Sequence, residues 1–294
     1  MPTTVQFNRS QTIFGIVLMC IGVACLCVND AIAKQLNDSY STFQILFLRN
    51  LIAFPFALAV VLKFGGRRAL RSHKPVMHLL RGLIWLCAAF IFFTSLRYLE
   101  LAEATALIFV APLFITALSA LLLKEHVGIW RWSAVVIGFI GVLIVVRPGA
   151  ATFQAAAILP LVTALFYAIL MISARWVDPR ESVWTLMLYL VGAGALLSAL
   201  AMPFVWSPVQ SADLWLFFGI AFFGTAGMTM MTQAFRFAPA SVVASLDYTA
   251  MIWATLLGWV FWMELPDTLT FVGAAVIIAS GGIIILRERA NAQG

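Results

Sequence analysis

One segment of this chain occurs twice. Residues 97–125 read RYLELAEATALIFVAPLFITALSALLLKE, and residues 236–264 read RFAPASVVASLDYTAMIWATLLGWVFWME. The two align without a gap, so that Arg97 falls on Arg236 and Glu125 falls on Glu264. Each copy is followed by a glycine-containing apolar segment that ends in arginine. A duplication of this kind indicates that the chain is built from two copies of one structural unit.

The composition excludes a soluble protein. Hydrophobic residues make up 63% of the 294 residues and charged residues 10%, against roughly 45–50% and 25% in soluble domains. At about 20 residues per span, the apolar runs predict an all-α integral membrane protein with ten transmembrane helices. The predicted spans are 12–33, 42–63, 77–97, 101–123, 130–147, 155–175, 183–203, 213–235, 240–263 and 268–286.

The duplication divides these helices into two five-helix repeats, residues 1–150 and residues 151–294. Because five is an odd number, the second copy enters the membrane from the opposite face, and the repeats are inverted. Inverted repeats around a central cavity are a recurrent plan of secondary transporters. The alternative is a duplicated bundle that serves only as a membrane scaffold or regulator.

Lysine and arginine are distributed unequally between the two predicted faces. Of the 18 such residues, 14 lie toward the face that holds both termini, and 4 lie toward the other face: Lys34, Arg49, Arg97 and Arg147. The positive-inside rule therefore places both termini in the cytoplasm. The same distribution explains the net charge of +6 without a nucleic-acid partner, and anionic lipid headgroups are the expected partners of the basic connection 63–81.

Catalytic and metal-binding motifs are absent from the sequence. It holds no HExxH, no GxSxG and no glycine-rich phosphate loop. All four cysteines lie inside apolar spans, without the spacing of a metal site or a disulfide. The sequence thus predicts a protein that is not an enzyme and that has no cofactor or metal. The first apolar stretch, 13–32, lacks a strong basic leader and a cleavage site, so we expect a retained helix.

Polar side chains inside the predicted spans are candidates for substrate contact, because a polar group in hydrocarbon is costly. Asn29 and Asp30 lie in the first span, and Lys34 follows one turn later. Asp30 and Lys34 either pair with each other on one helix face or reach the charged ends of a substrate. Arg49, flanked by apolar residues in the second span, also needs a partner, and an ion pair between the first two helices is an equally open alternative.

Two acidic side chains have no acidic counterpart in the other copy. Glu103 lies near the N-terminus of the fourth span, where the helix dipole favours a carboxylate, and it falls on Val242. Asp247 lies about two turns into the ninth span and falls on Ile108. A charge that the duplicated framework does not share favours a functional role. Gln233 in the eighth span adds a neutral hydrogen-bonding group.

Aromatic and sulfur-containing side chains at mid-depth complete the candidate site. Tyr167 and Met171 lie one turn apart on one face of the sixth span, although such a stripe also fits core packing. The aromatic candidates that carry a polar atom are Trp85, Tyr167, Tyr248 and Trp253.

The matched helices are also candidates for gating, and Glu103 of the fourth span belongs to this gating or structural group. Arg97 and Arg236 begin the two copies of the duplicated segment, and Pro112 lies in the middle of the fourth span, where the second copy has Met251. Because proline removes one helical hydrogen bond, we predict a bend in the first copy that the second copy does not share.

The arginine-led repeats, the NDAIAK of the first span and the GVLIVVRPG that closes the fifth together resemble the EamA family of the drug/metabolite transporter superfamily. The resemblance covers nearly the whole chain and implies a ten-helix inverted-repeat transporter, with a cavity formed largely by helices 1, 3, 4, 6, 8 and 9. Similar members include bacterial inner-membrane exporters of amino acids, aromatic ones among them. The family often has a second proline where this chain has Met251. Its motif marks Arg97, Pro112, Glu125, Arg236 and Glu264.

We therefore predict a monomer-competent secondary transporter of the bacterial inner membrane that exports amino acids, including apolar and aromatic ones, by alternating access. Another small metabolite or a drug-like cation is the alternative substrate. The side chain of an amino acid is expected among Trp85, Tyr167, Met171, Tyr248 and Trp253, and its charged ends at Asp30, Lys34, Gln233 or Asp247.

The charge distribution predicts the sidedness of the chain. Reporter domains fused after Gly294 and within the 65–74 connection are expected to report cytoplasm, because basic residues gather on that side. Paired alkaline phosphatase and fluorescent-protein fusions measure this directly. A periplasmic result at either position contradicts the inverted arrangement of two five-helix copies.

Overall fold

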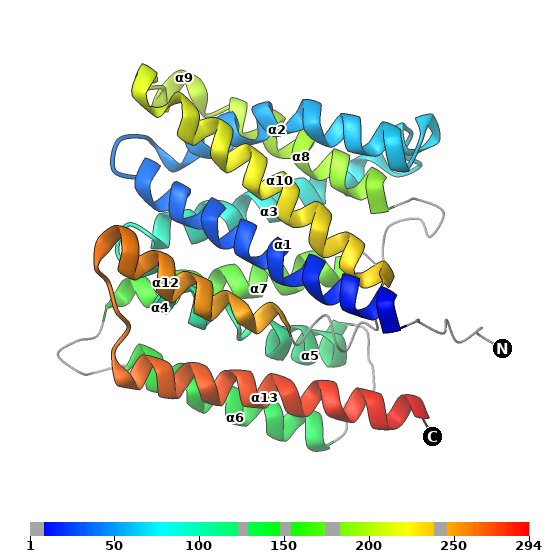
Figure 1. The fold of residues 1–294 in the computed structure, drawn as a ribbon, viewed down its shortest axis with the longest axis vertical. Helices are drawn as coiled ribbons and strands as arrows, with labels where there is room; N and C mark the ends of the chain where they lie inside the picture. Colours follow the sequence, from blue (N-terminus) through cyan, green and yellow to red (C-terminus); the bar gives the residue numbers. More distant parts are fainter. Residues whose placement is uncertain (1–8, 123–128, 148–153, 174–182, 238–245, 294) are drawn as a thin grey trace.

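The computed structural model describes residues 9–122, 129–147, 154–173, 183–237 and 246–293, and the regular structure in these ranges is helical. The long helices lie side by side, with their axes roughly along one direction (Figure 1). The helices are α1 (Arg9–Leu36), α2 (Thr42–Phe64), α3 (Pro75–Ser95), α4 (Leu101–Ile108), α5 (Ala111–Leu122), α6 (Ile129–Val146), α7 (Ile158–Ser173), α8 (Val183–Ala199), α9 (Met202–Val205), α10 (Leu214–Phe237), α12 (Ala250–Trp262) and α13 (Thr268–Gln293), with short 3-10 turns at Arg67–Leu70, Ala155–Ala157, Ser211–Asp213 and Leu246–Thr249 (η5).

Six of the described helical segments are long and apolar enough to cross a membrane: Ser10–Leu36, Thr42–Phe64, Pro75–Ser95, Leu101–Leu118, Ala155–Ser173 and Ser211–Ala234. Three shorter apolar helices, Trp132–Val146, Trp184–Ala199 and Thr268–Ser280, lie at other predicted spans. The chain is thus a multi-pass helical membrane protein. The total of ten spans stays a prediction.

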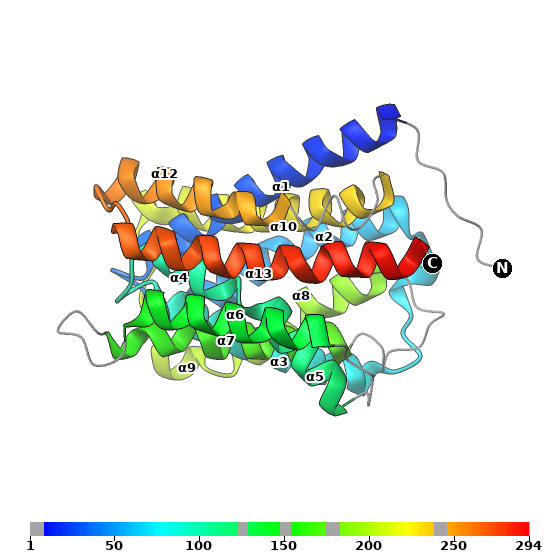
Figure 2. The same cartoon turned by 90° about the horizontal axis from the view of Figure 1, so that it is seen from below.

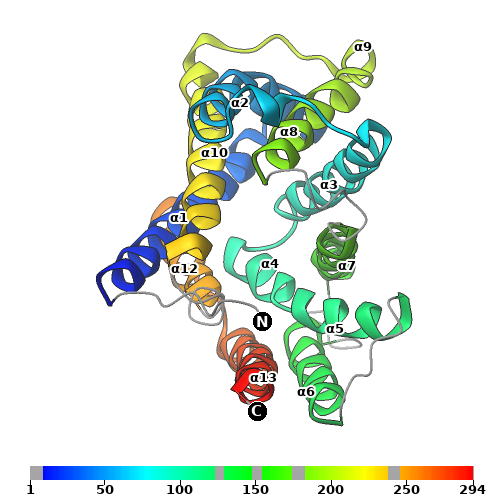
Figure 3. The same ribbon diagram turned by 90° about the vertical axis from the view of Figure 1, so that its right-hand side faces the viewer.

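The two ends of the bundle differ. At one, which we call the terminal end, α1 begins and α13 ends (Figure 1). At the other, which we call the distal end, lie the turns 37–41, 96–100, 206–210 and 263–267. Viewed along the bundle, α2 and α8 form one edge, α6 and α13 form the other, and α4 lies near the centre (Figure 3). The oblique helix α1 carries its first turns to the outside of the bundle (Figure 2).

The helix pairs that pack together correspond between the two halves of the chain. The main contacts join α1 with α10, α3 with α7, α2 with α8, and α6 with α13. In the predicted repeat, α1, α2, α3 and α6 of the first half correspond to α7, α8, α10 and α13 of the second. The pair of α1 with α10 therefore corresponds to the pair of α7 with α3. The other two pairs each join a helix to its own counterpart. The matched helices α1 and α7 also run in opposite directions, since α1 ends at the distal end and α7 begins there (Figure 1).

Glycines allow the closest approach within two of these pairs. A Cβ atom at Gly227 of α10 would lie 2.8 Å from the carbonyl oxygen of Gly22 in α1. A Cβ atom at Gly273 of α13 would lie 2.8 Å from the carbonyl oxygen of Gly141 in α6. Any larger residue would therefore separate the backbones. Small residues at helix contacts are the usual means of close packing in membranes, where water does not drive the helices together.

Within the described residues, both copies of the duplicated segment depart from a regular α-helix at the same position. In the first copy α4 ends at Ile108 and α5 begins at Ala111. In the second copy α12 begins at Ala250, which aligns with Ala111, and the 3-10 turn η5 precedes it. The prediction that only the first copy departs from a straight helix was wrong.

Different side chains lie at the two interruptions. In the first copy, Pro112 lacks the N–H that would bond to the carbonyl of Ile108 in a continuous helix. In the second, where Met251 replaces proline, the hydroxyl of Thr249 donates a hydrogen bond of 2.7 Å to the Leu246 carbonyl. The same bond to the i−3 carbonyl is made by Ser280 inside the continuous helix α13, so it does not by itself interrupt a helix. The second copy thus departs from a regular α-helix without a proline at the aligned position.

Candidate functional site

A polar cluster joins α1, α2 and α3, roughly 9 Å from the distal end at 1.5 Å per helical residue. Asn29 Oδ1 accepts a hydrogen bond of 3.0 Å from Arg49 Nε, and Asn29 Nδ2 donates one of 2.9 Å to Asp30 Oδ1. The Arg49 guanidinium carbon lies 5.3 Å from the ring centroid of Trp85. The structure thus brings three predicted site residues, Asn29, Asp30 and Trp85, together with Arg49.

Asp247 lies in η5, at the interruption of the second copy. Its side chain is exposed, and no hydrogen bond or ion pair joins it to another of the described residues. Tyr167 of α7 and Tyr248 lie within electrostatic reach of its carboxylate. Cys27 of α1 lies within reach of both Asp247 and Asp30. The two acidic side chains therefore belong to one region.

Several of these side chains keep accessible surface. Asp30 and Arg49 are half-buried, Asp247 is exposed, and the side chain of Tyr167 is 41% exposed. Neighbouring side chains therefore do not cover these groups completely.

Aligned residues of the two copies touch each other. The rings of Phe109 and Tyr248 pack edge to face, with centroids 5.2 Å apart. Phe109 falls on Tyr248 when the duplicated segments are aligned. A contact between equivalent residues is what the predicted inverted arrangement of the two copies requires near their common axis.

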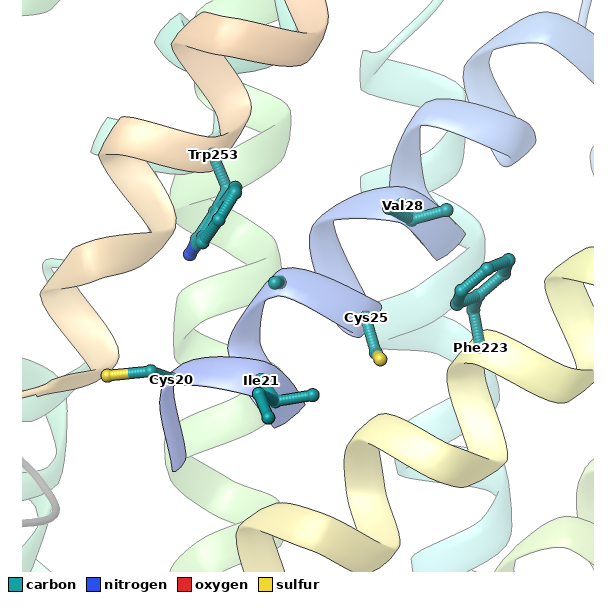
Figure 4. Close-up of a pocket in the computed structure, with 7 residues that line it drawn as sticks. Cys20, Ile21, Cys25, Val28, Phe223 and Trp253 are labelled. Carbon is teal, nitrogen blue, oxygen red and sulfur yellow. The ribbon is translucent and has the colours of Figure 1, made fainter. Parts of the chain in front are cut away.

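Trp253 lies at a separate, apolar hollow of about 250 Å³ between α1, α10 and α12. Its ring projects from α12 toward α1, and Phe223 of α10 lies on the other side of Cys25 (Figure 4). The remaining lining residues are Cys20, Ile21, Ala24 and Val28 of α1. None of the charged candidates lines this hollow, so the prediction that Trp253 shares a site with Asp247 stays a prediction.

Lys34 pairs with the second half of the chain rather than with Asp30. Its Nζ atom lies 2.7 Å from Glu264 Oε1 and 2.5 Å from Oε2. It also donates a hydrogen bond of 3.2 Å to the Leu99 carbonyl and lies 5.1 Å from the ring centroid of Trp262. The alternative of an ion pair within the first helix is therefore wrong. The ammonium group joins α1, the 96–100 turn and the end of α12.

Other bonds at the distal end also join the two halves. The Tyr40 hydroxyl donates to Asp213 at 2.7 Å, and the Gln44 side chain both donates to and accepts from the backbone of Ser207. Arg97 instead bonds within the first half, to the Tyr40 carbonyl at 2.8 Å and to the side chain of Asn37 at 3.3 Å. The contacts of Tyr40 and Gln44 thus join the two halves of the chain at the distal end.

The exposed ion pair of Arg147 and Asp267 lies at the same end. Arg147 Nη2 lies 2.6 Å from Asp267 Oδ1, and this hydrogen bond lowers the pKa of Asp267 to about 2. Because that pKa lies below the usual value of about 3.9, the pair stabilises the fold at neutral pH. Its contribution is lost as the pH falls from about 4 toward 2. An exposed pair is worth only about 0–1 kcal/mol.

The other predicted residues lie outside the central cluster. Glu103 is half-buried in the first turn of α4, within electrostatic reach of Arg147. Met171 and Gln233 are half-buried on α7 and α10, and no described contact joins either to the cluster. Pro112 is the second residue of α5. The side chain of Arg236 and the whole of Glu125 lie outside the described residues.

Sequence reasoning left two contributors out of the candidate site. Arg49 was recognised as a charge that needs a partner, and an acidic partner was expected. Its hydrogen-bond partner is instead the neutral amide of Asn29. Glu264 was marked only by the family motif, and its distance along the chain from Lys34 hid the pairing. Among the described residues, no group of three or more His, Cys, Asp or Glu side chains could hold a metal ion.

Comparison with known proteins places these features in a family. The model of the EamA-like transporter family matches the chain twice, over residues 13–147 and 154–286. An S-adenosylmethionine uptake transporter of Rickettsia prowazekii is 27% identical, over 94% of this chain and 93% of that protein. The pseudopaline exporter CntI of Pseudomonas aeruginosa is 24% identical over 90% and 94%. A riboflavin transporter of Vibrio cholerae is 29% identical over 80% of each chain.

The ion pair of Lys34 and Glu264 is expected to contribute to stability as a unit. Lys34→Met and Glu264→Gln each leave one charge without its partner, so each should destabilise the protein by about 1–3 kcal/mol. The double variant should lose less than the sum of the two. Thermal unfolding of the purified protein in detergent measures all three.

The exposed pair of Arg147 and Asp267 provides the matched control. Arg147→Met and Asp267→Asn should change stability by less than about 1 kcal/mol each. If the stability losses of Lys34→Met and Glu264→Gln add up to the loss of the double variant, the two side chains do not interact.

Proposed function

Because the chain belongs to the EamA-like transporter family, we propose that it is a secondary transporter that moves small organic solutes across the bacterial inner membrane by alternating access. The chain is a transporter, not an enzyme. We further propose that it exports amino acids, including apolar and aromatic ones. Its relatives are named for uptake as well as export, so the direction rests on the proposal and not on the family.

The architecture that we propose for this cycle consists of two inverted five-helix repeats, residues 1–150 and 151–294, around a central cavity. It is supported by the two separate matches of the family model and by helix pairs that correspond when the halves are exchanged. It is also supported by the edge-to-face contact of the aligned residues Phe109 and Tyr248. Both termini are proposed to lie in the cytoplasm.

The exposed carboxylate of Asp247 is the observation that carries the proposal. It lies about 20 Å along the helix from the distal end, at 1.5 Å per residue, and therefore inside a hydrocarbon layer about 30 Å thick. A charged group at such a depth is costly unless it is paired or faces a water-filled cavity. No described residue pairs with it. A cationic group of the transported solute, arriving through the proposed central cavity, would provide the missing partner.

The charge of amino acids and the apolar surface of their side chains support them as the transported solutes. The ammonium group would meet Asp247, and an apolar or aromatic side chain would lie against Tyr167 and Tyr248. Tyr167 offers accessible aromatic surface, since 41% of it is exposed. S-adenosylmethionine, which the Rickettsia relative is named for, is itself an amino acid derivative.

A drug-like cation or another small metabolite is the second candidate. The same acidic side chains would hold a cation that has no carboxylate, and the riboflavin transporter among the relatives is named for a solute that is not an amino acid. Competition by simple organic amines separates the two candidates. If such amines inhibit transport as strongly as amino acids do, the result favours a cation as the substrate.

Removal of the Asp247 charge should impair transport more than folding. Asp247→Asn keeps the shape of the side chain and deletes its charge, so uptake of labelled amino acids into proteoliposomes should fall on the order of 10-fold, as for a lost hydrogen bond to a charged group. The yield and the melting temperature should stay close to those of the wild type.

Asp38→Asn is the matched control for this experiment. Asp38 is exposed on the turn between α1 and α2, and its replacement should leave uptake unchanged. Wild-type uptake by Asp247→Asn would assign this carboxylate to the framework and remove the main support for the proposed site.

A further inference from the structure

We propose that Arg49 is the receptor for the carboxylate of the transported solute and that Asn29 positions it. This inference rests on the proposed transport function and specifies its substrate class, namely organic solutes that carry a carboxylate. It follows from four features of the cluster: the anchoring of one guanidinium nitrogen, the freedom of the other two, the indole beside them, and the glycine behind them.

The anchoring uses only one edge of the guanidinium group. Arg49 Nε donates to Asn29 Oδ1 at 3.0 Å. The orientation of the Asn29 amide is fixed in turn, because its Nδ2 donates to Asp30 Oδ1 at 2.9 Å. Asn29 is 2% exposed, so water does not compete for these bonds. The chain from Asp30 through Asn29 thus holds Arg49 in one orientation.

The two terminal nitrogens of Arg49 have no hydrogen-bond acceptor among the described residues. Within that part of the chain, only Nε of the guanidinium group donates a hydrogen bond. The side chain is deep in the protein but keeps accessible surface. A guanidinium group presents its donors as a planar fork that matches the two oxygens of a carboxylate. Arg49 therefore has the part of its fork that a carboxylate would use still available.

Two neighbours hold the guanidinium group in place without occupying its donors. Its carbon lies 5.3 Å from the centroid of Trp85, within the range of a cation–π contact. A Cβ atom at position 224 of α10 would lie 2.7 Å from Arg49 Nη2 and 2.7 Å from Asn29 Oδ1. Gly224 therefore leaves the space that the guanidinium group needs. Neither neighbour offers a side-chain acceptor.

A second donor close by has no acceptor either. The amide nitrogen of Asn50, the next residue of α2, is buried and without a partner among the described residues. A Cβ atom at Gly194 would lie 2.8 Å from this nitrogen and 2.9 Å from the Trp85 ring, so the amide lies beside the same indole. Arg49 and Asn50 thus both carry nitrogen donors without a partner among the described residues. Such donors favour an acceptor-bearing ligand such as a carboxylate.

The acidic side chains near Arg49 indicate what other charged group the solute carries. Asp30 lies within electrostatic reach of Arg49, and both Asp30 and Asp247 lie within reach of Cys27. A carboxylate held by Arg49 would thus have acidic groups near it, which disfavours a simple anion. It favours a zwitterion, whose ammonium group faces those acids. An amino acid head group has this pattern.

Binding of paired ligands to the purified wild-type protein tests the inference. The pairs are phenylalanine and phenylalaninamide, methionine and methioninamide, and benzoate and benzamide, measured by calorimetry or by tryptophan fluorescence. We expect the carboxylate of each amino acid pair to bind on the order of 10- to 100-fold more tightly than its amide, the range for hydrogen bonds to a charged group. Benzoate should bind more weakly than the amino acids.

Variants of the cluster assign the preference to Arg49. Arg49→Gln should abolish the preference for the carboxylate and leave the affinity for the amide within about 2-fold, which also shows that the variant is folded. Arg49→Lys should keep part of the preference, because it retains the charge and loses the fork. Asn29→Ala should lower the preference to an intermediate value. Lys63→Gln, which deletes an exposed charge on the same helix, should change nothing.

The outcomes separate this inference from the proposed function. If Arg49→Gln keeps the full preference, or if the wild type binds acid and amide equally, Arg49 is not the receptor, while transport of amino acids can stand. If none of the carboxylates binds to the wild type, both this inference and the proposed amino acid substrates are overturned.

Discussion

The cost of a charge in hydrocarbon governs this structure. Each charged side chain at depth must be paired, reach the membrane surface or face water. Lys34 satisfies this requirement with Glu264, the Leu99 carbonyl and the Trp262 ring. By contrast, Asp247 and the terminal nitrogens of Arg49 have no partner among the described residues. These incompletely paired charges lie in one region, and that region is where a transported solute would complete them.

The duplication determines where that region can be. Since both copies break at aligned positions, Ala111 and Ala250, the irregular backbone of both halves meets near the centre of the bundle. The contact of Phe109 with Tyr248 marks this meeting point. Irregular backbone inside a membrane is tolerated where protein buries it or where it borders a water-filled cavity. The interruptions and the unpaired charges thus support the same central site.

Much of the fold could be predicted from the sequence, because apolar runs and an ungapped repeat determine helix positions directly. The site was harder to predict. A bend was predicted at Pro112 alone, but the second copy also departs from a regular α-helix at the aligned position, in the 3-10 turn η5. Pairing of Lys34 with Asp30 was one of two alternatives, because local spacing is visible in a sequence, whereas the contact with Glu264 depends on how distant helices pack.

The proposed alternating access requires the distal end to open. Because Lys34 joins the 96–100 turn to the end of α12, we expect these two segments to move apart when it does. Spin labels at the exposed residues Tyr98 and Leu265 report this distance. Labels at Val76 and Tyr98, which lie near the two ends of the single helix α3, provide the control. In protein shown to transport, substrate should shift the Tyr98–Leu265 distribution between a short and a long population and leave the control unchanged. A single Tyr98–Leu265 distance that is insensitive to saturating substrate would contradict alternating access at this end.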